Sequence, residues 1–127
     1  GQQERNAGRL SNARTEFNAA LKLDSRYPDG YYGLGKVDLQ ENKFPEAEKN
    51  FSTVVRLDSQ HAKAYFAHAG LLLQTKEWDA ALGKINSALT LKHKEAESYY
   101  LQGTAYEGRK GENDLEQAKA SSRLASR

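Results

Sequence analysis

The sequence predicts an all-α protein built from repeated helical hairpins, and two observations lead to this fold class. Tyr31-Tyr32 recurs as Tyr65-Phe66 and again as Tyr99-Tyr100, and each step is 34 residues. Within each period, apolar residues follow the i, i+3, i+4 spacing of amphipathic helices, whereas period-two alternation is never sustained. A fixed period of this length indicates a stack of repeated units, each too small to bury its own apolar face.

Further columns of the repeat indicate how the two helices of each unit meet. Small residues allow two helices to cross closely, and bulky residues fill the space beside the crossing. Pro28 and Pro45 suit first helical turns, because proline lacks the N–H that is unpaired there, and Asn42-Lys43 suits the turn between helices. The columns are small at Gly35, Ala69 and Gly103, alanine at Ala13, Ala47 and Ala81, leucine at Leu23, Leu57 and Leu91, and bulky at Phe17, Phe51 and Ile85 and at Leu10, Phe44 and Trp78.

The period divides the chain into about three full repeats preceded by half of one. We expect a single domain over residues 1–127, with a partial repeat at 1–27 and full repeats at 28–61, 62–95 and 96–127. The last repeat keeps its register only if about three residues are inserted around 110–113. We therefore expect a longer loop at Gly108 to Gly111, followed by a final helix.

Composition and charge exclude several classes of protein. Hydrophobic residues make up 38% and charged residues 28%, so the chain should fold. The 19 basic and 17 acidic residues are interleaved, which argues against a nucleic-acid surface. No apolar run approaches the roughly 18 residues of a membrane span. The chain has no Cys, which leaves both cytoplasm and periplasm open, and no Met, which suggests that something upstream was removed.

The residue patterns of catalysis and metal binding are missing. His61, His68 and His93 lack the spacing with carboxylates that a zinc site needs. The glycines from 103 to 111 lack the Lys-Ser or Lys-Thr of a phosphate-binding loop, and no serine sits in a nucleophile elbow. We expect no enzymatic activity, no metal and no cofactor.

The repeat resembles the tetratricopeptide repeat, a 34-residue helix–turn–helix with fixed aromatic, small and bulky positions. The resemblance implies a right-handed α-solenoid in which the first helix of each repeat lines a concave groove. Ser25, Ser59 and His93 replace the proline that often closes the second helix, and His68 and Gln102 depart from the type of Leu34. The residues that carry the pattern are Tyr31, Leu34, Gly35, Ala47, Phe51 and Val54.

The resemblance also implies which side chains line that groove. Aromatic residues make good anchors because they give a large contact area with few rotors to freeze, and Tyr32, Phe66 and Tyr100 supply one per hairpin. Tyr31, Tyr65 and Tyr99, about 100° away around the helix, should face the hairpin core. The expected groove residues are Tyr32, Lys36, Leu39, Gln40, Lys63, Phe66, Gly70, Leu73, Gln74, Tyr100, Thr104 and Glu107.

The charges at these positions suggest how a partner would be oriented. Lys36 and Lys63 should lie toward one end of the groove, and Glu97 and Glu107 toward the other. The family's clamp for an acidic C-terminus is not reproduced, because the matching positions hold other residue types. Those positions are Tyr32, Lys36, Ala67, Glu97 and Leu101.

The sequence thus predicts a protein–protein interaction module or scaffold that binds a peptide or a helical segment of a partner. Two alternatives stay open. The chain could assemble with copies of itself through Leu10, Ala13 and Phe17, which the first half repeat presents. It could also be the regulatory arm of a larger protein whose catalytic or membrane part lies outside this chain.

Overall fold

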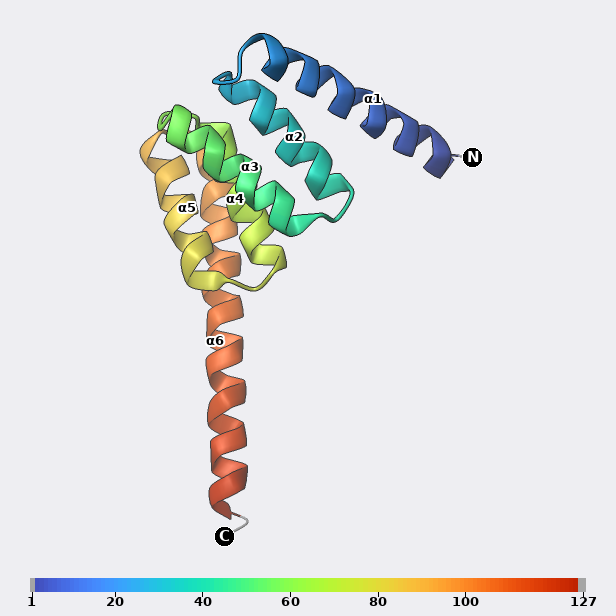
Figure 1. Ribbon diagram of the computed structural model, residues 1–127. Helices are drawn as coiled ribbons and strands as arrows, with labels where there is room; N and C mark the ends of the chain where they lie inside the picture. Colours follow the sequence, from blue (N-terminus) through green and yellow to red (C-terminus); the bar gives the residue numbers. More distant parts are fainter. Residues whose placement is uncertain (1, 126–127) are drawn as a thin grey trace.

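The computed structural model describes the backbone of residues 2–125 and the side chains of residues 4–120, and its regular structure there is entirely α-helical. The all-α prediction is confirmed. None of these helices is long and apolar enough to cross a membrane. The helices are α1 (Gln2–Leu23), α2 (Pro28–Gln40), α3 (Phe44–Leu57), α4 (Ala62–Gln74), α5 (Trp78–Thr90) and α6 (Glu95–Ala125) (Figure 1).

Each helix packs mainly against its neighbours along the chain. The pairs α2·α3 and α4·α5 form antiparallel hairpins, and the contacts α1·α2, α3·α4 and α5·α6 join the units together. The first helices α2, α4 and α6 also touch in succession, so they form one layer. The distal half of α6 extends beyond the other helices (Figure 1).

The hairpins close around the small and bulky columns of the repeat. A Cβ atom at Gly35 would lie only 2.6 Å from Cε1 of Phe51, whose side chain is fully buried. In the second hairpin, Ala69 and Ile85 belong to one buried cluster. The glycine in α2 is therefore required by the close approach of the Phe51 ring, and not by a turn.

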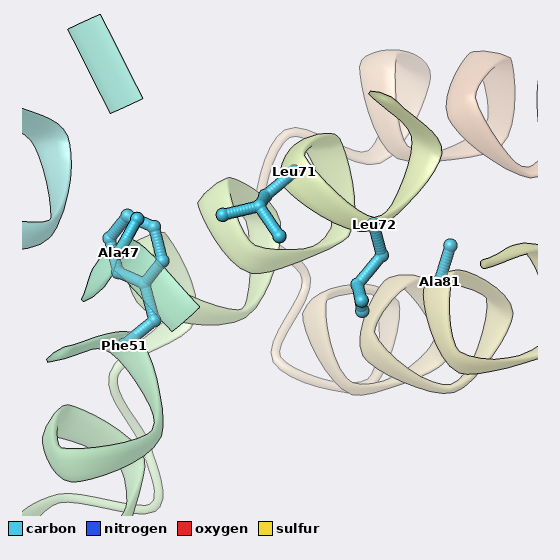
Figure 2. Close-up of a cluster of buried hydrophobic side chains, with 5 residues drawn as sticks. All are labelled: Ala47, Phe51, Leu71, Leu72 and Ala81. Carbon is cyan, nitrogen blue, oxygen red and sulfur yellow. The ribbon is translucent and has the colours of Figure 1, made fainter. Parts of the chain in front are cut away.

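Helix α4 joins the two hairpins through adjacent leucines. Leu71 and Leu72 belong to the same buried cluster as Ala47, Phe51 and Ala81. Figure 2 shows the two side chains leaving α4 in different directions, Leu71 on the side of Phe51 and Leu72 toward Ala81. Because one helix contributes to both neighbours, the core is continuous from one repeat to the next.

The turns inside the two hairpins occupy the same repeat position. Asn42 has φ 60° and Lys76 has φ 61°, and the two residues are 34 positions apart. Pro28 and Pro45 lie at the starts of α2 and α3, as predicted. The left-handed conformation costs a non-glycine residue of order 1 kcal/mol or more, so packing of the helices on either side must hold these turns.

Helix α1 is attached to the first hairpin by a polar network around one buried carboxylate, which the sequence did not reveal. Asp38 is 1% exposed. Its carboxylate accepts a 2.9 Å hydrogen bond from Arg14 of α1 and a 2.7 Å hydrogen bond from Asn50 of α3. Arg14 also pairs with Glu41. The network fixes how α1 sits on the hairpin, because a buried carboxylate without partners is strongly unfavourable.

The predicted loop at Gly108 to Gly111 is wrong, because α6 is one continuous helix of 31 residues. Gly108 instead lies against the indole ring of Trp78. Tyr99, expected in a hairpin core, is 60% exposed, and nothing lies within 4 Å of a Cβ placed at Gly103. In the last repeat, therefore, no second helix packs against the small residue Gly103 among the described residues. Residues 1, 126 and 127 of the predicted end repeats lie outside the described residues, and the repeat boundaries stay a prediction.

Two alanine substitutions in the same repeat column should have opposite effects on stability. Gly35→Ala forces the Phe51 ring to shift, and such overpacking costs about 1 to 3 kcal/mol, more than the roughly 1 kcal/mol gained by removing a helical glycine. Gly103→Ala meets no neighbour and should stabilise the protein by about 0.5 to 1 kcal/mol. Urea unfolding followed by circular dichroism gives both values. Destabilisation by Gly103→Ala would contradict the straight α6.

Candidate partner-binding groove

A hollow of about 590 Å³ opens between α2 and α4 and is bounded by the loop that joins α5 to α6. Its lining includes aliphatic side chains, two aromatic rings, and basic and amide side chains. We call this surface the hollow. Its residues are Tyr32, Lys36, Leu39, Lys63, Phe66, Ala67, Gly70, Leu71, Gln74, His93 and Lys94.

The structure brings together seven of the twelve residues that the sequence placed in a groove. These seven come from α2 and α4 and are Tyr32, Lys36, Leu39, Lys63, Phe66, Gly70 and Gln74. Whether they contact a partner stays a prediction. Sequence reasoning missed Ala67, Leu71, His93 and Lys94. The last two belong to the loop between repeats, where the 34-residue spacing gives no guide to side-chain direction.

The other five predicted residues do not line the hollow. Gln40 lies beside α1 in a separate depression, and Leu73 packs against both buried clusters. Tyr100 is 75% exposed, and Thr104 and Glu107 are exposed on the same helix. Where the sequence predicted lining residues from α6, the hollow is instead lined by His93 and Lys94 of the α5–α6 loop.

Tyr32 is held in the hollow by an arrangement that begins at the start of α4. The Nδ1 atom of His61 accepts a hydrogen bond from the N–H of Ala64 at 3.2 Å, so the proton of the neutral ring lies on Nε2. Nε2 donates it to Asp29 at 2.8 Å, and the imidazole ring lies 5.2 Å from the ring of Tyr32. Burial, with a smaller effect of Asp29, raises the pKa of Tyr32. Tyr32 therefore presents a neutral, positioned ring.

Phe66 is the second aromatic side chain of the hollow and has two partners from the α5–α6 loop. The His93 and Phe66 rings form a T-shaped pair with 5.7 Å between their centroids, and Nζ of Lys94 lies 5.2 Å from the Phe66 centroid. Lys92 and Lys94 have φ 57° and 43°, so this loop turns through left-handed residues just before α6. The loop thereby places a cation beside an aromatic ring, a favourable contact.

The charge of the hollow is positive, and the predicted orientation of a partner by charges of opposite sign stays a prediction. Lys36, Lys63 and Lys94 line it, whereas Glu97 and Glu107 do not. The pKa of His93 is lowered, first by burial and then by Lys94 and Lys63. Among the described residues, no group of three or more His, Asp or Glu side chains could hold a metal ion.

His68 lies in the core beside Phe51. Its ring centroid is 6.2 Å from that of Phe51, and the residue is 4% exposed. Its Nε2 is 3.7 Å from Oε1 of Glu48 and has no hydrogen-bond partner among the described residues. Burial chiefly, and then Lys84, lower the pKa of His68, while Glu48 and Glu77 oppose the shift. His68 is a neutral part of the core.

The repeat pattern and the hairpin geometry define a helical-repeat protein. The sequence matches the tetratricopeptide repeat family over residues 32–96 and a TPR repeat description over residues 1–41. The chain belongs to the tetratricopeptide repeat family. Neither match extends past residue 96, just after the α6 helix begins.

Solved structures of helical-repeat proteins have the same fold. The TPR2B domain of yeast Sti1 in its complex with pHsp70 superposes with a TM-score of 0.75 at 20% identity, with 84% of this chain and 90% of that chain covered. The Yersinia enterocolitica chaperone SycD, in complex with a peptide of the translocator YopD, superposes with a TM-score of 0.70 at 20% identity, with 87% of each chain covered. MamA from Desulfovibrio magneticus RS-1 superposes with a TM-score of 0.75 at 23% identity, with 85% of this chain and 61% of that chain covered.

These likenesses establish the fold. The chain spans about three fifths of the MamA chain that it matches. A sequence comparison with curated proteins finds no match.

The lowered pKa of His68 predicts that stability falls in mild acid. The unfolded state takes up a proton near the ordinary value of 6.5, while the folded state resists it, so stability is complete above about pH 6.5 and is lost as pH falls through the lower folded pKa. His68→Leu removes this titration, and leucine already fills the equivalent position at Leu34. Urea unfolding between pH 8 and pH 5 should show the wild type losing up to about 1.4 kcal/mol per pH unit more than the variant. Parallel curves would contradict the prediction.

Proposed function

We propose that this chain is a non-enzymatic binding module that holds a segment of a partner protein in the hollow. The observation that carries the proposal is the pair of supported aromatic rings, Tyr32 on α2 and Phe66 on α4, beside an open hollow of about 590 Å³. Positioned aromatic side chains give much contact area at little entropic cost, so they serve well as anchors.

Two features of the surroundings support a polypeptide as the ligand. The hollow has an aliphatic part of its lining at Leu39, Ala67 and Leu71, which suits apolar side chains, and it is open to solvent. The SycD and Sti1 structures named above contain a peptide and a pHsp70 partner, respectively. Those complexes are consistent with the proposal, although the likeness itself concerns the fold.

Replacing Phe66 of the hollow and the equivalent aromatic residue of α6 separately should distinguish the hollow from the rest of the first-helix layer. Phe66→Ala should weaken partner binding by about thirtyfold, as expected for loss of a central aromatic contact. Tyr100→Ala is the matched control, because Tyr100 fills the same repeat position on α6 but lies outside the hollow. Partner is first captured from the source cell on immobilised wild-type protein, and the purified partner segment is then titrated calorimetrically.

Circular dichroism must show equal helicity for both variants before their affinities are compared. Equal affinity of wild type and Phe66→Ala would remove the hollow from the proposal. Loss of binding in Tyr100→Ala alone would transfer the site to α6.

Self-association is a second candidate function, and the exposed aromatic residues of α6 favour it. Tyr99 is 60% exposed and Tyr106 is 49% exposed, and both lie on the stripe of α6 that contains Gly103. The α1 face that the sequence suggested for self-association is partly covered, since Phe17 lies against Gly33 in α2. An uncovered aromatic stripe of this kind can pack against the same stripe of a second copy.

Sedimentation velocity over a concentration series tests self-association. If the α6 stripe mediates it, the wild type should form dimers at high micromolar concentration, and the double variant Tyr99→Ser, Tyr106→Ser should stay monomeric, because its apolar contact is lost. Leu115→Ser, on the opposite side of α6, is the control. A wild-type monomer throughout the series dismisses this candidate.

A further inference from the structure

We infer that the segment bound in the hollow carries side-chain carboxylates next to a large apolar side chain. The inference rests on the proposed function and specifies the chemistry of its ligand. It follows from four features of the hollow: unpaired lysines, a lysine where a helix prefers an acid, a cation beside an aromatic ring, and a positive field at His93.

The three lysines of the hollow have no acidic partners among the described residues. Lys36 lies on α2, Lys63 at the start of α4, and Lys94 in the α5–α6 loop, and all three are exposed. Each ion pair that forms among the described residues involves other cations. Lysines gathered from three separate elements around one depression leave their charge available to a ligand.

Lys63 stands at a position where the other repeats have an acid. The equivalent residues are Asp29 in the first turn of α2 and Glu97 in the first turn of α6, whereas the first turn of α4 has no acidic residue. Carboxylates stabilise helix N-termini, because the helix dipole is positive there, and a lysine has the opposite effect. Lys63 is therefore unfavourable for α4 itself and adds to the positive potential of the hollow.

Lys94 combines the anionic and apolar parts of the proposed ligand. Its ammonium group lies beside the Phe66 ring, and Leu71 and Ala67 line the same hollow. A large apolar side chain placed against these residues would bring its flanking residues to the exposed lysines of the hollow. Carboxylates on those flanking residues would meet the cations without leaving water entirely, which limits their desolvation cost.

The nearby acids do not neutralise this field. Asp29 accepts a 2.8 Å hydrogen bond from His61, and Glu97 does not line the hollow. Lys94 and Lys63 still lower the pKa of His93 in addition to burial, whereas Glu97 raises it. Lysines spread over three elements fit several side-chain carboxylates better than the single carboxylate of a chain terminus.

The test uses fluorescent ten-residue peptides, blocked at both ends, and fluorescence anisotropy with the full chain. The first peptide has two acidic residues on each side of a Leu-Phe pair. The second replaces the acids by Gln and Asn, the third keeps the acids and replaces Leu-Phe by Ser-Ser, and the fourth is the second with a free C-terminal carboxylate. The first should bind at least tenfold more tightly than each of the others. Added salt should reduce the difference in affinity between the first peptide and the second.

Charge reversal at Lys63 separates binding from folding. Lys63→Glu restores the acid that the start of a helix prefers, so the variant should be at least as stable as wild type while binding the first peptide about tenfold more weakly. Lys119→Glu, on the exposed distal half of α6, is the matched control and should leave binding unchanged. A ligand carboxylate should also raise the pKa of His93, measured by NMR, because it offsets the nearby lysines.

The outcomes separate this inference from the function on which it rests. Equal binding of the first and second peptides, with both weakened by Phe66→Ala, would overturn the inference and leave the hollow as a binding site. Preference for the fourth peptide would assign the lysines to a chain terminus and also overturn it. No binding of any peptide at millimolar concentration would count against both the inference and the proposed function.

Discussion

Every hairpin in this protein depends on one constraint: the second helix can approach the first only where the first carries no large side chain. Gly35 permits the ring of Phe51 to lie directly against the backbone of α2, and Ala69 serves the second hairpin in the same way. Close approach buries Phe51 completely, and α4 then covers the other side of that residue with Leu71. Since each hairpin leaves part of its apolar face for the next, this local crossing leads to the continuous core of the stack.

The same repeat position forms a turn or a helix according to its packing. Asn42 and Lys76 adopt left-handed turns, whereas Gly8 and Lys110, which are 34 residues before and after them, lie inside α1 and α6. Glycine is the residue best suited to such a turn, yet Gly8 is helical and Lys76 turns. Burial of a second helix against two neighbours outweighs the conformational cost of the turn, and without that burial the helix continues.

The hollow follows from the same stacking, but its chemistry does not. The layer formed by the first helices must leave a depression wherever short residues such as Ala67 and Gly70 face it. The three lysines make no ion pair with the described residues, and Lys63 opposes the helix it begins. Side chains that destabilise the fold, or do not stabilise it, are more informative about binding than Tyr32, which also packs against Phe51 and His61.

The sequence by itself determined the two central hairpins, because a constant spacing of aromatic, small and bulky residues leaves one way to pair the helices. It also placed Tyr32 and Phe66 on the first-helix layer, since helical periodicity fixes the face on which a side chain lies. Only the tertiary structure decided that α6 stays straight, that the α5–α6 loop brings His93 and Lys94 to the hollow, and that Arg14, Asp38 and Asn50 meet. These outcomes depend on contacts between segments far apart in the chain, and the local residue pattern contains no record of such contacts.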